Sequence, residues 1–66
     1  MKLTVNGKEE QYDAVATVGD LLKALEVNTG RVAVMVNEAV IRRADLDAVE
    51  LREGDAVEVI TMVGGG

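Results

Sequence analysis

The sequence predicts an α+β domain in which a mixed sheet of four to five strands carries one main helix packed on one face. Three observations predict this class. Several short segments alternate polar and apolar residues at the period of a β-strand, one segment has the spacing of an amphipathic helix, and turn-forming residues separate these segments. Because only one helix is available, it can cover only one face of the sheet.

The first two expected strands form a hairpin. Residues Lys2–Val5 alternate polar and apolar side chains, and the following Asn6-Gly7 is a pair preferred in type I′ turns. A returning strand over Lys8–Asp13 should follow. Its first half is polar throughout, so we interpret it as an exposed edge strand that Tyr12 anchors to the core.

The clearest helix is expected over Val18–Glu26. Thr17 is a suitable N-cap, Asp20 lies in the first turn, and apolar residues recur at i, i+3, i+4 and i+7. These apolar positions are Val18, Leu21, Leu22 and Leu25. Asn28 and Gly30 are the expected stop signals after the helix.

The second half of the chain predicts three further strands. They are Val32–Val36, a short strand over Val40–Arg42 after a turn at Asn37-Glu38, and the longest strand over Ala56–Val63 after a turn at Glu53–Asp55. Residues Ala44–Val49 should form a loop or a single helical turn, from which Leu46 and Val49 reach the core. This order of elements is typical of a β-grasp (ubiquitin-like) domain, which we expect to occupy residues 1–63.

Alternation also assigns the two faces of the sheet. We expect the residues that face the helix to be Leu3, Val5, Val32, Val34, Val36, Val57 and Val59. The opposite, uncovered face should carry Ala33, Met35, Ile60 and Met62. Exposed apolar patches mark interaction surfaces, and methionine suits a surface that meets several partners. We interpret these four residues as a partner-docking face, with a dimer contact or simple strand filling as the alternative.

Composition excludes several classes of function. The 66 residues include no cysteine, histidine or serine, so no disulfide framework, thiolate nucleophile or imidazole-based site can form. Seven basic and twelve acidic residues give a net charge of -5, which disfavours nucleic acid as a partner. No apolar run is long enough for a membrane span or a signal peptide. We expect a cytoplasmic protein that is monomeric when free.

Acidic pairs occur in the second half of the chain. Asp45 and Asp47 form one pair, and Glu53 and Asp55 form another. Both pairs lack the spacing of a calcium loop, so we interpret them as solvated turns and predict no metal site.

Gly64, Gly65 and Gly66 follow the last expected strand as a flexible tail. A frayed end is one explanation. The chemical explanation is that a segment without Cβ atoms is thin enough to thread a narrow active site. There the α-carboxylate, a poor electrophile at neutral pH, could be adenylated to a mixed anhydride. ATP and Mg²⁺ would be bound by an activating partner, because the chain has no nucleotide-binding motif, so the chain itself is a substrate and carrier and not an enzyme.

Several segments, in this order and at this length, together resemble the ThiS family of sulfur carriers, which are ubiquitin-like proteins of thiamine biosynthesis. The matching segments are Val5–Gly7, Thr17–Leu22, Val32–Asn37, Gly54–Ile60 and Val63–Gly66. The segment Glu38–Val40 departs from the Asn-Gly-type turn that the family would have there.

The resemblance implies a chemical role for the tail. A ThiF-like enzyme would adenylate Gly66, and sulfur originating from a cysteine desulfurase would convert it to a thiocarboxylate. A ThiG-like thiazole synthase would then receive that sulfur. Gly65 is the other half of the terminal pair, and Gly64 is an extension of it.

Other functions remain open from the sequence. A MoaD-like carrier for molybdopterin resembles this chain in fold, tail and activation but donates sulfur to a pterin precursor, and carriers for other sulfur pathways are similar. A β-grasp interaction module of a different class would use its sheet face alone. A protein modifier would form an isopeptide between Gly66 and a lysine of its target.

Overall fold

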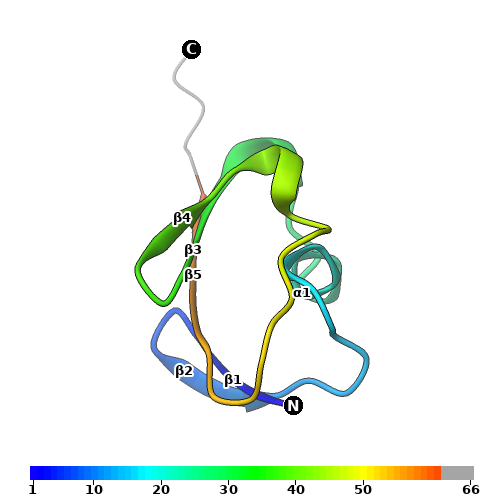
Figure 1. Ribbon diagram of the computed structural model, residues 1–66, viewed down its shortest axis with the longest axis vertical. Coiled ribbons are helices and arrows are strands. Elements are labelled where there is room, and N and C mark those ends of the chain that lie inside the picture. The colour runs from blue at the N-terminus through cyan, green and yellow to red at the C-terminus, as the bar shows by residue number, and fades with distance from the viewer. Residues whose placement is uncertain (62–66) are drawn as a thin grey trace.

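The computed structural model describes residues 1–61, in which five strands and one α-helix form a sheet with a helix against it (Figure 1). The strands are β1 (Lys2–Val5), β2 (Lys8–Gln11), β3 (Val32–Val36), β4 (Ala39–Ile41) and β5 (Ala56–Thr61). The helix α1 spans Val18–Ala24, and two 3₁₀ turns, η1 (Thr29–Arg31) and η2 (Arg43–Asp45), lie in the connections. No helix in this part of the chain has the length and apolar character needed to cross a membrane.

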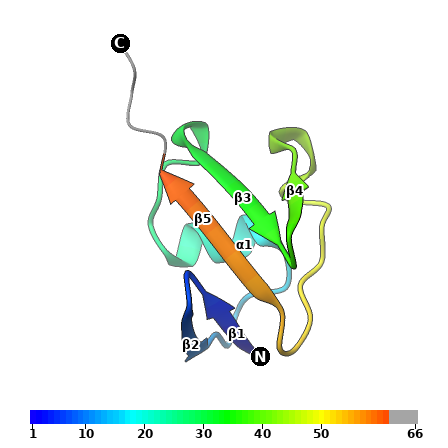
Figure 2. The same cartoon turned by 90° about the vertical axis from the view of Figure 1, so that its left-hand side faces the viewer.

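The sheet has the strand order β2-β1-β5-β3-β4, with β5 at its centre. β1 and β5 pair in parallel, with Thr4 opposite Ala56 and Val5 opposite Val57, whereas the other neighbours are antiparallel. Figure 2 views the sheet from the face away from α1 and shows β5 running between β1 and β3, with the helix behind them. The predicted mixed sheet with one helix on one face is therefore confirmed.

The core lies between α1 and the sheet. The buried residues of the sheet are Leu3, Val5, Val32, Val34, Val36 and Val57. The helix adds Val18, Leu21 and Leu22, and the connections add Val15, Leu46 and Leu51. All predicted helix-facing positions except Val59, which is half-buried, are therefore buried, and Leu46 and Val49 reach the core as expected. Apolar alternation predicted these contacts because strand side chains point to opposite faces in turn.

The start of α1 is fixed by a capping box. Thr17 Oγ1 accepts the Asp20 N–H at 3.2 Å, and the Asp20 carboxylate accepts the N–H groups of Thr17 at 3.1 Å and Ala16 at 3.0 Å. These bonds satisfy backbone donors that have no partner within the helix, so α1 begins where the sequence predicts.

The end of α1 lies two residues before the predicted Glu26. Leu25 is the C-cap, and Glu26 adopts a left-handed backbone with φ 58°. The N–H groups of Glu26 and Val27 donate to the carbonyls of Lys23 at 3.1 Å and Leu22 at 3.3 Å, which is a Schellman motif. The predicted stop signals act later: the Asn28 side chain accepts the Gly30 N–H at 2.9 Å and caps η1.

Other predicted boundaries shift slightly. β2 ends at Gln11 and not at Asp13, although the Tyr12 N–H still donates to the Met1 carbonyl at 2.8 Å. β4 begins and ends one residue early, because a two-residue turn sets Ala39 opposite Val36. The predicted loop or helical turn over 44–49 overlaps η2, which spans Arg43–Asp45 and so starts one residue earlier. β5 is described as far as Thr61, and the predicted strand residues 62 and 63 lie outside the described part of the chain.

Candidate functional site

The sheet face turned away from α1, here called the open face, carries those predicted docking residues that the structure describes. Ala33 and Met35 are half-buried on β3, and Ile60 on β5 is 49% exposed. The β3–β5 register sets Ala33 opposite Ile60, so these side chains are neighbours on one face. Met62 and the tail residues Gly64, Gly65 and Gly66 lie outside the described residues.

Val40 on β4 enlarges the apolar part of the open face, and sequence reasoning missed it. It lies opposite Met35 and is 71% exposed. The signal was present in the chain: a two-residue turn at Asn37-Glu38 pairs Met35 with Val40, and paired residues share a face. An exposed valine beside a methionine on an uncovered sheet makes a continuous apolar patch with Ala33 and Ile60.

A shallow hollow of about 400 Å³ lies on the open face beside the turn from β3 to β4. Its lining residues are Met35, Asn37, Glu38, Ala56 and Glu58. Met35 and Ala56 make its apolar part, whereas Glu38 and Glu58 bring two exposed carboxylates to it. The sequence-based docking face did not include these glutamates, because charged residues on a surface are ordinarily explained by solvation alone.

Asn37 holds the turn at this hollow against the start of β5. Its Nδ2 donates to Asp55 Oδ1 at 3.0 Å, and its Oδ1 accepts the Ala56 N–H at 3.0 Å. Asp55 also accepts the Arg52 N–H at 2.9 Å, and Glu53 accepts the Lys2 N–H at 2.9 Å. The carboxylates of this acidic pair are therefore hydrogen-bond acceptors: Asp55 closes the turn that follows Arg52, and Glu53 joins that turn to the start of β1.

Asn6, which directly follows β1, also hydrogen-bonds to the backbone of β5, on the β1 side of that strand. Its Oδ1 accepts the Val59 N–H at 2.8 Å, and its Nδ2 donates to the Val59 carbonyl at 3.2 Å. The side chain thus continues the parallel pairing of β1 with β5 beyond the end of β1. These two asparagine side chains, here called the asparagine clamps, hydrogen-bond to β5 at Ala56 and at Val59, on either side of Glu58.

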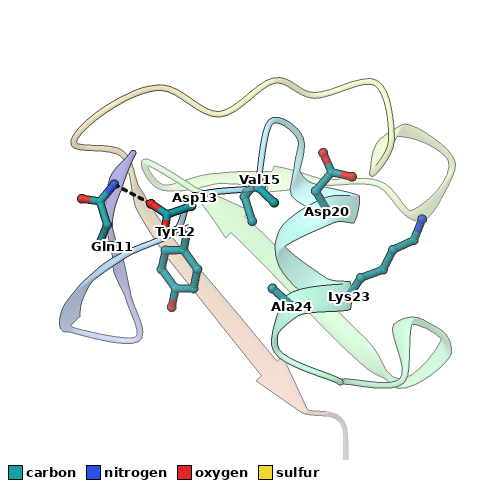
Figure 3. Close-up of a pocket in the computed structure, with 8 residues that line it drawn as sticks. Gln11, Tyr12, Asp13, Val15, Asp20, Lys23 and Ala24 are labelled. Atoms are coloured by element: carbon teal, nitrogen blue, oxygen red, sulfur yellow. Dashed lines mark hydrogen bonds between the residues drawn. The ribbon is translucent and has the colours of Figure 1, made fainter.

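A second hollow, of about 490 Å³, lies between the end of β2 and α1, where its walls include Tyr12, Asp20 and Lys23 (Figure 3). Partial burial and then the neighbouring Glu10 carboxylate, which accepts the Tyr12 hydroxyl at 3.4 Å, raise the pKa of Tyr12. The Asp20 carboxylate is occupied by the capping box. Because its acid groups already bond within the chain, this hollow is a weaker candidate than the open face.

The capping box makes a prediction for pH. The N–H groups of Ala16 and then Thr17 hold the pKa of Asp20 below its ordinary value. A depressed folded-state pKa stabilises the fold fully above the unfolded-chain pKa of about 3.9, and this contribution is lost as pH falls through the folded value. Asp20→Asn removes this contribution, so we expect the urea midpoint of the variant to lie below that of wild type at about pH 6. The midpoint difference from wild type should therefore shrink between about pH 6 and pH 3. A difference that stays constant with pH would contradict the assignment.

The sheet order, the single covering helix and the apolar open face define a β-grasp protein of the ubiquitin-like class. The ThiS family matches the sequence over residues 2–66. The chain therefore belongs to the ThiS family, and the resemblance noted from its motifs is confirmed.

A solved structure agrees with this assignment. The crystal structure of the thiamine biosynthesis protein ThiS from Geobacter metallireducens superposes with a TM-score of 0.86 at 42% identity, and the match covers 100% of both chains. The β-grasp arrangement is thus shared with a ThiS protein along its whole length.

Two curated relatives are much longer. Proteins named thiazole synthase from Paramagnetospirillum magneticum and Magnetococcus marinus are 36% and 39% identical over all 66 residues of this chain. In each case the match covers 20% of the relative. This chain therefore spans about one fifth of the length of these relatives.

Proposed function

We propose that this chain is a sulfur carrier of thiamine biosynthesis that is modified at Gly66 and read by its partners through the open face. The observation that carries the proposal is the ThiS family match, which runs through the glycine segment to residue 66. Similarity to a solved ThiS protein at 42% identity supports it. The free chain is a monomer and acts in the cytoplasm, where ATP is supplied to its activating enzyme.

The chemistry takes place on the carboxylate of Gly66. A ThiF-like enzyme binds ATP and Mg²⁺, and the carboxylate oxygen attacks the α-phosphorus, so that pyrophosphate leaves and an acyl adenylate forms. The persulfide formed by a cysteine desulfurase attacks the acyl adenylate, and AMP departs with one former carboxylate oxygen. A thiol then cleaves the resulting acyl disulfide, so that the thiocarboxylate is released and the thiol is oxidised to a disulfide. The chain supplies a thin, activatable end and no catalytic side chain, so it is a carrier and not an enzyme.

The thiocarboxylate of Gly66 then passes its sulfur to a ThiG-like thiazole synthase. Support for this partner comes from the relatives named thiazole synthase, each of which contains a stretch similar to this whole chain. A carrier segment within such a protein keeps donor and acceptor at high effective concentration. A carrier that is not joined to its partner would instead recognise that partner through a surface.

The open face supplies that surface. Ile60 lies on β5, the strand that leads in sequence toward the glycine segment, and Ala33 lies opposite it on β3. Met35 and Val40 extend the same face across β3 and β4. An enzyme that covers these apolar side chains would hold the strand from which the tail departs. Docking and delivery of Gly66 would therefore use the same element.

Intact-mass measurement tests the proposal. The chain is incubated with the ThiF-like enzyme of its own organism, Mg-ATP, cysteine, the cysteine desulfurase and a thiol reductant. We expect a gain in mass equal to one exchange of oxygen for sulfur, located by fragmentation at Gly66. A variant that lacks Gly65 and Gly66 should remain unmodified while keeping its fold.

The other outcomes identify the alternatives. An unchanged mass, under conditions that modify a known carrier, would exclude the thiocarboxylate. An isopeptide to a target lysine would identify a modifier, and full biological activity without Gly65 and Gly66 would identify an interaction module. Transfer of the sulfur to a pterin precursor in place of the thiazole synthase reaction would identify a MoaD-like carrier.

A further inference from the structure

Glu58 occupies an unusual place for a charged residue. It lies on β5, the central strand of the sheet, and its side chain is on the open face in register with Met35. Met35 in turn lies opposite Val40, and Ile60 follows two residues along β5. The Glu58 carboxylate therefore lies at the edge of the apolar patch, with Met35 on its β3 side and the polar residues Thr4 and Asn6 on its β1 side.

The position of Glu58 affects binding if a partner covers the open face, and that premise rests on the proposed function. Any surface that contacts both Met35 and Ile60 also removes the Glu58 carboxylate from water. A carboxylate buried without a counter-charge is strongly unfavourable, whereas one paired with a hydrogen-bonded cation is tolerated. The covering protein must therefore bring a positive charge to Glu58.

The part of the chain that the structure describes places no cation in an ion pair with Glu58. Within residues 1–61 the ion pairs join Lys2 to Glu9 at 4.0 Å and Lys8 to Glu10 at 3.2 Å, and both lie on the β1–β2 hairpin. Glu38 brings a second carboxylate to the same hollow, from a position where φ is 72°. Glycine would adopt this left-handed backbone with less strain, yet the chain places an acid there.

We propose that the hollow lined by Met35, Glu38, Ala56 and Glu58 receives an arginine side chain of the activating enzyme. The guanidinium lies between the two carboxylates, and its aliphatic stem packs on Met35 and Ala56. Arginine fits better than lysine because its planar fork can donate to two acceptors at once and its charge is more weakly hydrated. The apolar patch of Ala33, Val40 and Ile60 adjoins this ionic contact and is covered with it.

Glu58→Gln tests the proposal, because the arginine contact predicts that this variant binds the ThiF-like enzyme more weakly than wild type. Affinity for the ThiF-like enzyme is measured by calorimetry at low and at high salt, with the full chain and without ATP. If an arginine meets Glu58, the variant should bind at least about 10-fold more weakly and show a smaller salt dependence. If no cation meets Glu58, loss of its charge from an apolar contact should leave binding unchanged or strengthen it, and the proposal is then wrong.

Glu38→Gly separates docking from stability. The change removes a carboxylate from the hollow and relieves a left-handed backbone, so its urea midpoint should rise while its affinity falls. Glu26→Gly is the matched control, because Glu26 has φ 58° and lies after α1, behind the sheet. It should raise the urea midpoint in the same way and leave affinity unchanged. Equal loss of affinity in both variants would show a general effect of net charge and overturn the proposal.

These binding measurements distinguish failure of the arginine contact from failure of the proposed function. If the chain acquires sulfur but Glu58→Gln binds as tightly as wild type, only the arginine contact is wrong. If binding depends on Glu58 and Glu38 but the mass never changes, the docking surface stands and the sulfur chemistry is wrong. If the wild-type chain does not bind the ThiF-like enzyme at all, both the arginine contact and the proposed function are wrong.

Discussion

Leu22→Ala is expected to leave little folded protein at ordinary temperature. Leu22 is fully buried on α1, facing the sheet. Truncation of a buried leucine to alanine costs about 2–5 kcal/mol, because transfer energy is lost and a cavity remains. A single core in a chain of this size rarely supplies more than about 3–5 kcal/mol in total. The expected loss is therefore comparable with the whole stability of the domain, and far-UV circular dichroism with urea titration would measure it.

Leu25→Ala is the matched control for this substitution. It removes the same atoms from a residue at the C-cap of α1 that is only partly buried. We expect it to cost about 1 kcal/mol and to leave a cooperative unfolding transition. Equal destabilisation by the two variants would mean that α1 does not face the sheet through Leu22.

Val40→Glu is expected to abolish productive docking at low enzyme concentration. Val40 is the most exposed large apolar residue within residues 1–61, at 71%, and it lies beside Met35 on the open face. Affinity for the activating enzyme should fall by about 100-fold, because a packed contact is lost and an unpaired carboxylate is brought into it. Titration calorimetry would give the affinity, and the amount of thiocarboxylate formed at limiting enzyme would give the functional effect.

The free energy of unfolding of Val40→Glu is a control for the predicted loss of affinity. Because Val40 is exposed on an edge strand, the free variant should lose no more than about 1 kcal/mol. Ala48→Glu adds the same charge at an exposed position after η2, away from the open face, and should bind as wild type does. If both variants weaken binding alike, added charge is the cause, and the open face is not the docking surface.

The sequence was sufficient for the fold class because its signals are local and agree with one another. Alternation in residues 32–36 and 56–60 marks strands, and the capping box at Thr17 and Asp20 marks the start of the only α-helix within residues 1–61. The end of that helix was predicted too late because a glutamate, Glu26, holds the left-handed position that usually has glycine. A helix end of this kind leaves no compositional signal.

The candidate site was predicted only in part, for a different reason. Alternation within each strand placed Ala33, Met35 and Ile60 on one face, and this placement agrees with the register. Val40 required the pairing between strands, which alternation in one strand does not give. Alternation does set Glu58 on the same face as Ile60, but a charged surface residue is ordinarily explained by solvation and so was not counted as part of the site. The hollow depends on Asn37, whose side chain spans from the β3–β4 turn to Ala56. Such long-range hydrogen bonds have no sequence pattern of their own.

The clamp between Asn6 and Val59 also has a consequence for how the chain folds. These residues are 53 positions apart, and the parallel pairing of β1 with β5 closes a loop of similar size. Loops of this length close at an entropic cost, and contacts across them form slowly. During synthesis the β1–β2 hairpin must wait, with one edge of β1 unpaired, until residues 56–59 emerge from the ribosome. β5 is thus both the strand that carries part of the proposed docking surface and the strand that joins the two halves of the sheet. A chain whose synthesis stops before β5 would therefore lack both the complete fold and the docking surface.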